Sequence, residues 1–281
     1  MNLPITHHVK PFRNRQHGRS EMFDLVMYKY IRLEYVLNML ETRILRFANI
    51  KKWEDVYENF VGKENIIIRD AKRRVMPSFD CFGQSWTTLE ESDAMWRIYS
   101  DDGYAVKVKT AYPLLNKVLL DWNTRHEDDQ IWPLTDYVFY ADEKEINEWL
   151  VLHSPMNYWA FIELQGECLF IKRREFEHEK EIRVIFRDYK RAGKEYIGVD
   201  FDPNQFFLEI VIDPRVSEKE FIRQRDSLVA RGFESKRIRK STLYDFKKVE
   251  LVVDMEEPCD APIIVYEDGK PIQKYVPIGP F

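Results

Sequence analysis

The sequence contains little glycine and none of the glycine-rich loops that commonly bind phosphate groups. Only 10 of its 281 residues are glycine. Neither G-x-x-x-x-G-K-[ST] nor G-x-G-x-x-G occurs, so the turns whose backbone amides hold phosphates in P-loop and Rossmann proteins are missing. H-E-x-x-H and G-x-S-x-G are also absent. These absences exclude the usual forms of nucleotide cradling, zinc proteolysis and serine hydrolysis.

Cysteine, long apolar runs and clustered histidines are equally scarce. Cys81, Cys168 and Cys259 are odd in number and far apart, which argues against a disulfide framework or a structural zinc. No run of about 18 apolar residues occurs, and the N-terminus has no apolar segment. We therefore predict neither a membrane span nor a secretory signal, and we expect a cytoplasmic protein. Only His7 and His8 are adjacent among the histidines, so no metal site is expected.

An excess of positive charge is missing as well. The formal net charge is −5, which argues against avid non-specific binding to nucleic acid. Basic residues are nevertheless concentrated locally, in residues 172–174, in residues 236–240 and at the N-terminus, where Lys10, Arg13, Arg15 and Arg19 precede the first acid. Each run either covers a solvated surface or contacts phosphate, and the sequence leaves both open.

The composition predicts one large folded domain with distinct ends. Hydrophobic residues make up 44% and aromatic residues 14% of the chain, enough for a sizeable core. We expect a basic N-terminal arm at residues 1–22, a single α+β domain at residues 23–254 and a proline-rich tail at residues 255–281. The five prolines of the tail favour extended packing or disorder.

Hydrophobic periodicity predicts alternating strands and helices. The expected strands cover residues 23–30, 44–48, 79–84, 104–109, 137–140, 196–201, 206–212 and 249–253. The expected helices cover residues 33–42, 70–75, 93–99, 143–152 and 217–231. Ser217 and either Ser92 or Asp93 are suitable N-caps. This order of elements indicates a mixed α and β fold.

The most informative segment is residues 176–186, which we interpret as a strand. Period two would place Glu179, Glu181 and Arg183 on one face, with a mostly apolar opposite face. Paired carboxylates beside a buried strand are typical of acid-base chemistry, and Arg183 would keep Glu181 ionised by pairing with it. Alternating charges are also common on solvated edge strands, so both interpretations stay open.

Several aromatic residues lie near these acids and near the middle strands. Tyr28, Tyr30, Trp86, Trp96 and Tyr99 could stack on a nicotinamide ring or a nucleobase. Trp96 and Tyr99 are three residues apart on an expected helix, which is also the spacing of side chains that pack against a sheet.

Five sequence blocks carry a resemblance to a known family. The blocks are Tyr28-Lys29-Tyr30-Ile31-Arg32, Leu45-Arg46-Phe47 followed by Trp53-Glu54-Asp55, Cys81-Phe82-Gly83-Gln84-Ser85, Met95-Trp96-x-x-Tyr99 and Glu179-x-Glu181-x-Arg183. In these blocks and their order, residues 28–239 resemble the bacterial family called domain of unknown function 2971. The chain departs from the family pattern at Trp53-Glu54-Asp55, where Asn-Asp-Pro is usual, and at residues 82–85, where Phe-Ser is stretched.

The layout also resembles the ADP-ribosyltransferase fold remotely. That resemblance implies a split, mostly antiparallel sheet flanked by helices, with a cleft for NAD as co-substrate. The arginine of the first strand would be Arg32, which would bind the NAD pyrophosphate, with Lys29 as its substitute. The serine motif would be Ser85-Trp86-Thr87, in which Ser85 or Thr87 holds the catalytic glutamate or the ribose.

The same resemblance assigns the two glutamates different tasks. Glu181 would bind the ribose 2′-hydroxyl and stabilise the oxocarbenium-like transition state. Glu179 would accept a proton from the attacking group or orient that group.

The implied activity is ADP-ribosyl transfer to a macromolecule, which could be RNA, DNA or protein. Bacterial relatives of this kind are often toxins or phage-defence effectors, so an antitoxin or other neutralising protein would be a partner. Two alternatives remain. A noncatalytic nucleotide- or protein-binding module would tolerate loss of Glu181, and a metal-dependent nuclease would need E-x-K where this chain has the adjacent pair Glu179-Lys180.

Overall fold

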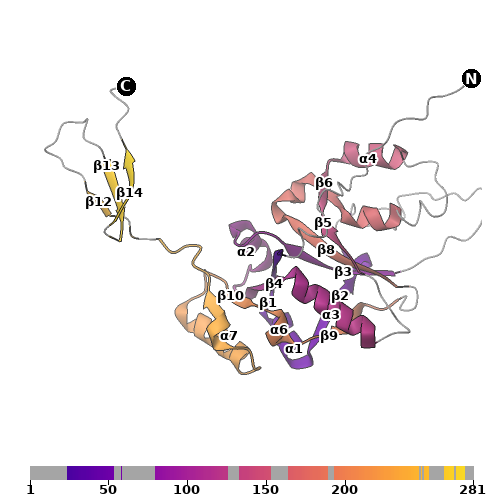
Figure 1. Ribbon diagram of the computed structural model, residues 1–281, viewed down its shortest axis with the longest axis horizontal. Helices are drawn as coiled ribbons and strands as arrows, with labels where there is room; N and C mark the ends of the chain where they lie inside the picture. Colours follow the sequence, from indigo (N-terminus) through magenta and orange to yellow (C-terminus); the bar gives the residue numbers. More distant parts are fainter. Residues whose placement is uncertain are drawn as a thin grey trace, which may run out of the picture. The chain divides into compact units, whose positions relative to one another are not determined.

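The protein is described by a computed structural model (Figure 1). The described residues are 24–53, 58, 80–125, 133–152, 164–188, 193–246, 248, 250–252, 263–268 and 270–275. Contacts divide the chain into two compact units, Met1–Ser241 and Thr242–Phe281. The expected arm at residues 1–22 and the expected helix at residues 70–75 lie outside the described residues.

The first unit contains the elements of the candidate site. Its strands include β1 (Val26–Arg32), β2 (Ile44–Asn49), β3 (Asp80–Thr87), β4 (Ala105–Ala111), β5 (Leu134–Tyr137), β6 (Phe139–Ala141), β7 (Ile171–Arg173), β8 (Glu181–Asp188), β9 (Tyr196–Asp200), β10 (Glu209–Ile212) and β11 (Ile238–Lys240). Its helices include α1 (Leu33–Thr42), α2 (Asp93–Tyr99), α3 (Tyr112–Arg125), α4 (Glu143–Leu152), α6 (Pro203–Phe206), α7 (Glu218–Val229) and the 3₁₀ helix η5 (Arg174–Glu179).

A nine-stranded, mostly antiparallel sheet forms the centre of this unit, which confirms the predicted α+β class. The strand order is β11-β10-β4-β1-β3-β2-β9, with β8 pairing both β3 and β5. In this sheet β10 and β11 run parallel, whereas the other pairs are antiparallel. Helices lie on both faces (Figure 1).

The sheet is split between β1 and β2, as expected. One edge of β3 pairs with β8 along its whole length. The other edge pairs with β2 at Phe82 and Gly83 and with β1 only at Thr87. Residues 84–86 of β3 therefore have no strand ladder on that edge, and the two halves of the sheet diverge there.

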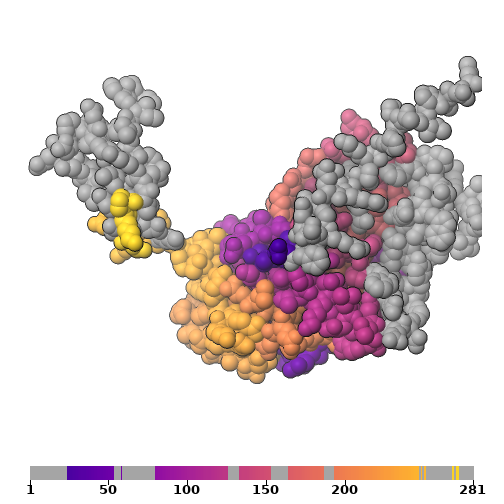
Figure 2. Space-filling view, viewed as in Figure 1, coloured from indigo at the N-terminus to yellow at the C-terminus, as the bar shows by residue number. Residues whose placement is uncertain are grey.

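Each face of the sheet packs against its own hydrophobic cluster. Ile182, Val184 and Phe186 of β8 join a core with α1, α3, α6 and α7, whereas Ile185 joins a second cluster with α4. Figure 2 shows the magenta atoms of α3 beside the orange atoms of α6. Because side chains alternate along a strand, Glu181 and Arg183 lie on the face opposite the larger core.

Local sequence signals account for several boundaries. Helices α1 and α4 have the predicted limits. Ser92 caps α2 by accepting a hydrogen bond from the Met95 amide, and Ser217 caps α7 in the same way from Glu220. Gly232 follows α7 with a φ of 86°, a conformation that glycine adopts without strain.

Other predictions were wrong in detail. Residues 137–140 contain parts of two strands, β5 and β6, because Val138 interrupts the pairing. The expected strand at 206–212 begins with the last residue of α6, whose N-cap is Asp202. The helix α3 was not predicted.

In the second unit β13 (Ile263–Glu267) pairs with β12 (Glu250–Val252) and β14 (Lys270–Tyr275), so the proline-rich tail forms part of a small sheet.

No helix among the described residues combines the length and apolar character needed to cross a membrane.

Candidate active site

Three neighbouring strands place a row of side chains on the face opposite the larger core. Tyr28 of β1 is paired with Thr87 of β3, and Thr87 is paired with Glu181 of β8. Ser85 lies two residues before Thr87 and therefore on the same face. The predicted tyrosine, serine motif and glutamate are thus brought together from three separate parts of the sequence.

Glu181 belongs to a buried cluster of charges. Its carboxylate accepts hydrogen bonds from Arg183, at 2.8 Å to Nε, and from Lys172, at 3.3 Å to Nζ. Lys172 also donates to Glu179 at 2.6 Å, and Arg183 pairs with Glu58. Arg183 is 0% exposed and Glu181 is 4% exposed. The alternative of a solvated edge face was therefore wrong.

Glu179 reaches this cluster by a different route from the one predicted. It ends η5 rather than lying on the strand, and Lys180 turns the chain with a φ of 43°. Its backbone carbonyl accepts a 2.6 Å hydrogen bond from Thr87 Oγ1. The two glutamates converge because a tight turn and Lys172 bring them together, not because of strand periodicity.

The surroundings separate the pKa values of the two carboxyl groups. Burial favours the neutral form of Glu181, but Arg183, Lys172 and a hydrogen bond from Ser85 outweigh it and lower the pKa of Glu181 to about 2. Burial raises the pKa of Glu179, and the nearby charge of Glu181 adds to the effect against the opposing influence of Lys172. Glu181 is therefore held ionised, while Glu179 is the better proton carrier of the two.

Aromatic side chains form the walls of a small cavity beside these acids. The cavity is about 60 Å³ and is lined by Glu179, Glu181, Ser85, Thr87, Lys29, Met95 and the aromatic residues Tyr28, Tyr30, Trp86 and Tyr99. Tyr99 is 40% exposed. Burial, followed by the charge of Glu179, raises the pKa of the Tyr99 phenol to about 12. The cavity therefore offers flat neutral rings next to a fixed negative charge.

Lys29 lies at the split in the sheet. Its Nζ donates a 2.7 Å hydrogen bond to the Ser85 carbonyl, in the part of β3 that has no ladder partner. Burial lowers its pKa to about 8, although Glu181 opposes the shift. Lys29 therefore remains mainly charged at neutral pH and is poised to lose its proton just above it.

Two predicted site residues do not line this cavity. Arg32 is exposed and pairs with Glu34 at 3.0 Å and with Asp102 at 2.9 Å. Trp96 is 0% exposed, donates from Nε1 to Glu91 at 2.6 Å and packs edge-on against Tyr30. Of the two basic candidates near the first strand, Lys29 is the one that lies at the cavity.

Sequence reasoning missed Lys172, Glu58 and Tyr140. Lys172 was interpreted as part of a surface basic run, yet it is 8% exposed and contacts Glu58, Glu179 and Glu181. The Tyr140 hydroxyl accepts a 2.8 Å hydrogen bond from the Glu181 amide. Strand β7 was not predicted, and its first two residues are both buried, so alternation gave no signal for Lys172.

The other basic residues of the two internal runs also have protein partners. Arg174 pairs with Glu145, and Arg239 pairs with Glu209. Arg237 donates to the Phe207 carbonyl at 2.7 Å. These partners oppose the interpretation of the runs as free phosphate-binding patches.

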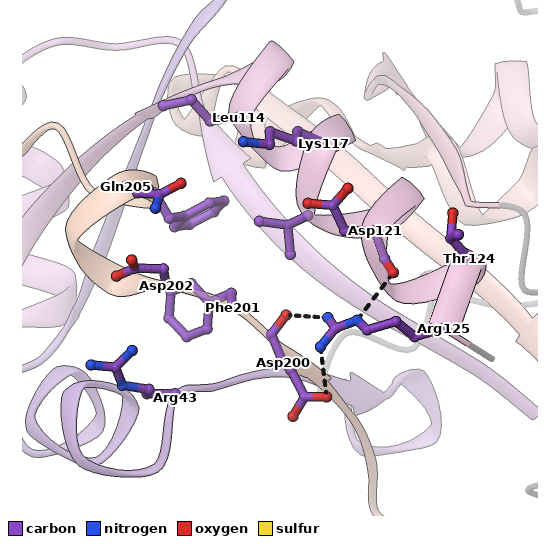
Figure 3. A pocket seen from close by; sticks show the side chains of 12 residues that line it. Arg43, Leu114, Lys117, Asp121, Thr124, Arg125, Asp200, Phe201, Asp202 and Gln205 are labelled. Atoms are coloured by element: carbon purple, nitrogen blue, oxygen red, sulfur yellow. Dashed lines mark hydrogen bonds and ion pairs between the residues drawn. The ribbon is translucent and has the colours of Figure 1, made fainter.

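A larger cavity lies away from the acids, between α3 and the segment that joins β9 to α6 (Figure 3). It measures about 710 Å³. Arg125 pairs with Asp200 in its wall, and its floor is partly apolar, with Phe201 and Phe206. None of the predicted site residues lines it, so its size alone does not make it the reactive site.

Within the described part of the chain, no group of three or more His, Cys, Asp or Glu residues is arranged to hold a metal ion.

Replacing Arg183 by methionine should destabilise the protein strongly. The change leaves Glu58 and Glu181 buried with less compensating charge, and breaking a buried ion pair in this way costs roughly 3–5 kcal/mol. Arg32→Met is the matched control, because Arg32 is exposed and its loss should leave the midpoint of urea unfolding nearly unchanged. Equal midpoints for the two variants would contradict a tightly packed charge cluster.

Comparison with known proteins gave limited matches. No family model matches the sequence, so the resemblance to domain of unknown function 2971 is not confirmed, and no curated protein matches it. The similar solved structures include Thermus sp. 2.9 DarT in complexes with carba-NAD⁺, with NAD⁺ and with ADP-ribosylated ssDNA. They are 10–12% identical to this chain, cover 77–78% of it and 94–96% of the DarT chains, and give TM-scores of 0.34–0.36. TM-scores at this level assign no family, so the proposals below depend on the geometry of the site.

Proposed function

We propose that the protein transfers ADP-ribose from NAD to a macromolecule. The observation that carries the proposal is the pair Glu179 and Glu181, whose pKa values are shifted in opposite directions beside one aromatic cavity. One permanently ionised carboxylate and one carboxyl group able to exchange a proton are what glycosyl transfer through an oxocarbenium-like transition state needs.

In the proposed step the bond between the ribose C1′ and the nicotinamide nitrogen breaks, and nicotinamide leaves with the bonding electron pair. A nucleophilic atom of the acceptor forms the new bond to C1′ and gives up its proton. Glu181 accepts a hydrogen bond from the ribose 2′-hydroxyl, and this interaction strengthens as positive charge develops on the ring. Arg183 and Ser85 support this role because they keep Glu181 ionised and fixed in orientation.

Glu179 is the proposed acceptor of the released proton. Its raised pKa makes it a more effective base than Glu181, and Lys172 holds the two carboxylates together. The proton on the attacking atom therefore ends on Glu179. The two remaining carboxylates, Glu58 and Glu181, are then balanced by Lys172 and Arg183.

Lys29 is the proposed partner of the NAD diphosphate, in place of Arg32. Lys29 lines the cavity and carries a positive charge there. The guanidinium of Arg32 pairs instead with Asp102 and Glu34, outside the cavity. Tyr28 and Tyr99 supply flat surfaces for the nicotinamide ring. A transferase of this kind would modify cellular RNA, DNA or protein, which suits a toxin or phage-defence effector controlled by a neutralising protein.

Replacing Glu181 by glutamine should reduce transfer by at least about 10²-fold, because the stabilising charge is lost at nearly constant volume. The assay incubates wild type, Glu181→Gln and Glu177→Gln with labelled NAD and separate RNA, DNA and protein fractions, and measures the attached label. Glu177 is a suitable control because it is exposed and pairs with Lys180 outside the cluster.

Label on one fraction with wild type and Glu177→Gln, but not with Glu181→Gln, would support the proposal and identify the acceptor class. Equal labelling by all three folded proteins would exclude the assigned role of Glu181. Absence of label in every fraction would favour the noncatalytic binding module.

The apparent KM for NAD should rise as the pH passes above about 8. Lys29 is charged below its pKa of about 8 and neutral above it, so its attraction for a diphosphate is lost as the pH increases. Lys29→Arg should remove this rise because arginine stays protonated, whereas Lys52→Arg, at an exposed ion pair with Glu195, should keep it. A KM that rises equally in Lys29→Arg and wild type would show that another group titrates.

A further inference from the structure

A third cavity lies at the split, on the face of the sheet opposite the two glutamates. It measures about 560 Å³, within the range of small-molecule sites. It opens among β1, β2, β3 and α1, and its apolar lining includes Ile31, Met39, Leu45, Val108 and Phe207. This cavity and the small cavity beside the glutamates share Lys29, Ser85 and Trp86. Between them, the hydrogen bond from Lys29 to the Ser85 carbonyl joins β1 to β3.

Two buried polar atoms in the lining lack hydrogen-bond partners among the described residues. They are Gln84 Oε1 and Trp86 Nε1, and their residues are 8% and 3% exposed. Gln84 Nε2 is already used, since it donates to the Arg46 carbonyl at 2.6 Å. A buried polar atom without a partner is unfavourable, so a ligand that supplied one donor and one acceptor would be stabilised here after a small side-chain adjustment.

Aromatic rings and positive charge surround the outer part of the cavity. Arg46 is exposed and stacks over the Tyr196 ring at 4.7 Å, and Lys52 forms an exposed ion pair with Glu195. Trp53 and Tyr35 also line it. Flat rings favour stacking with a heterocycle, and an exposed arginine favours a phosphate.

We propose that this cavity binds a nucleobase bearing a phosphate group, at a site separate from that of the reacting NAD. The edge of a nucleobase carries both a donor and an acceptor, which match Gln84 Oε1 and Trp86 Nε1. A purely apolar ligand would leave both atoms unpaired, and a ligand without a ring would not use the aromatic lining. The phosphate lies at Arg46. The base comes either from a free nucleotide or from a nucleic-acid strand.

The test measures binding of AMP, adenosine and a short single-stranded oligonucleotide to the full chain by calorimetry. Gln84→Met removes the amide at similar volume and should weaken AMP binding about tenfold, the effect of losing one hydrogen bond. Gln205→Met is the matched control, because Gln205 is exposed and lines the other large cavity. Arg46→Gln should abolish the preference for AMP over adenosine and leave adenosine binding unchanged.

Tighter binding of the oligonucleotide than of AMP, with the same dependence on Gln84, would support the site and assign it to a strand; the reverse order would support it and assign it to a free nucleotide. The proposal would be overturned by the absence of AMP and oligonucleotide binding at millimolar concentration, or by an unchanged affinity in Gln84→Met with an unchanged melting temperature.

Competition between NAD and AMP separates this inference from the proposed function. The Glu181→Gln protein is titrated with AMP in the presence and absence of NAD, so that no transfer is needed. AMP binding that persists in excess NAD supports a separate site. Loss of AMP binding in excess NAD, together with weaker NAD binding in Gln84→Met, would overturn it, because the cavity would then hold the adenine of NAD itself.

Discussion

The balance of charge in one buried cluster determines which carboxyl group of the candidate site takes up a proton. Two cations, Lys172 and Arg183, face three carboxylates, those of Glu58, Glu179 and Glu181. With every group ionised the cluster carries one excess negative charge, and burial makes that excess unfavourable. The bidentate contact with Arg183 fixes the charge on Glu181, so the tendency to take up a proton falls on Glu179.

The cluster in turn depends on how β3 is paired. Strand β3 is hydrogen-bonded to β1 and β2, one from each half of the split sheet, and it pairs with β8 along its full length. The Thr87 side chain then anchors the backbone of Glu179. Because Thr87 is paired with both Tyr28 and Glu181, a shift of register by one residue would turn Ser85 and Thr87 away from the acids. The fold therefore fixes the site through hydrogen bonds between strands rather than through a loop motif.

Much of the fold was predictable from local signals, and the site was predictable only in part. Helix α1 and the N-cap at Ser217 follow from periodicity and capping, which are properties of neighbouring residues. The pairing of Glu181 with Arg183 was predictable, because the two residues are two apart on one strand. Lys172 could not be recognised, because its partners are 7 to 114 residues away and its run of basic residues resembles a surface. Arg32 was preferred to Lys29 by analogy, whereas pairing with Asp102 directs Arg32 to solvent.

The position of Lys29 gives the two cavities a physical connection. Its ammonium group holds the Ser85 carbonyl at the point where the ladder is missing, while the Ser85 side chain bonds to Glu181 on the other face. A phosphate that attracted the Lys29 ammonium group would weaken its hydrogen bond to the Ser85 carbonyl. The hydrogen bond from the Ser85 side chain to Glu181 would then change as well. Conversely, Glu181 favours the charged form of Lys29 against the effect of burial. Since the interaction between two charges acts equally on both, the protonation of Lys29 and the orientation of Glu181 are coupled across the sheet.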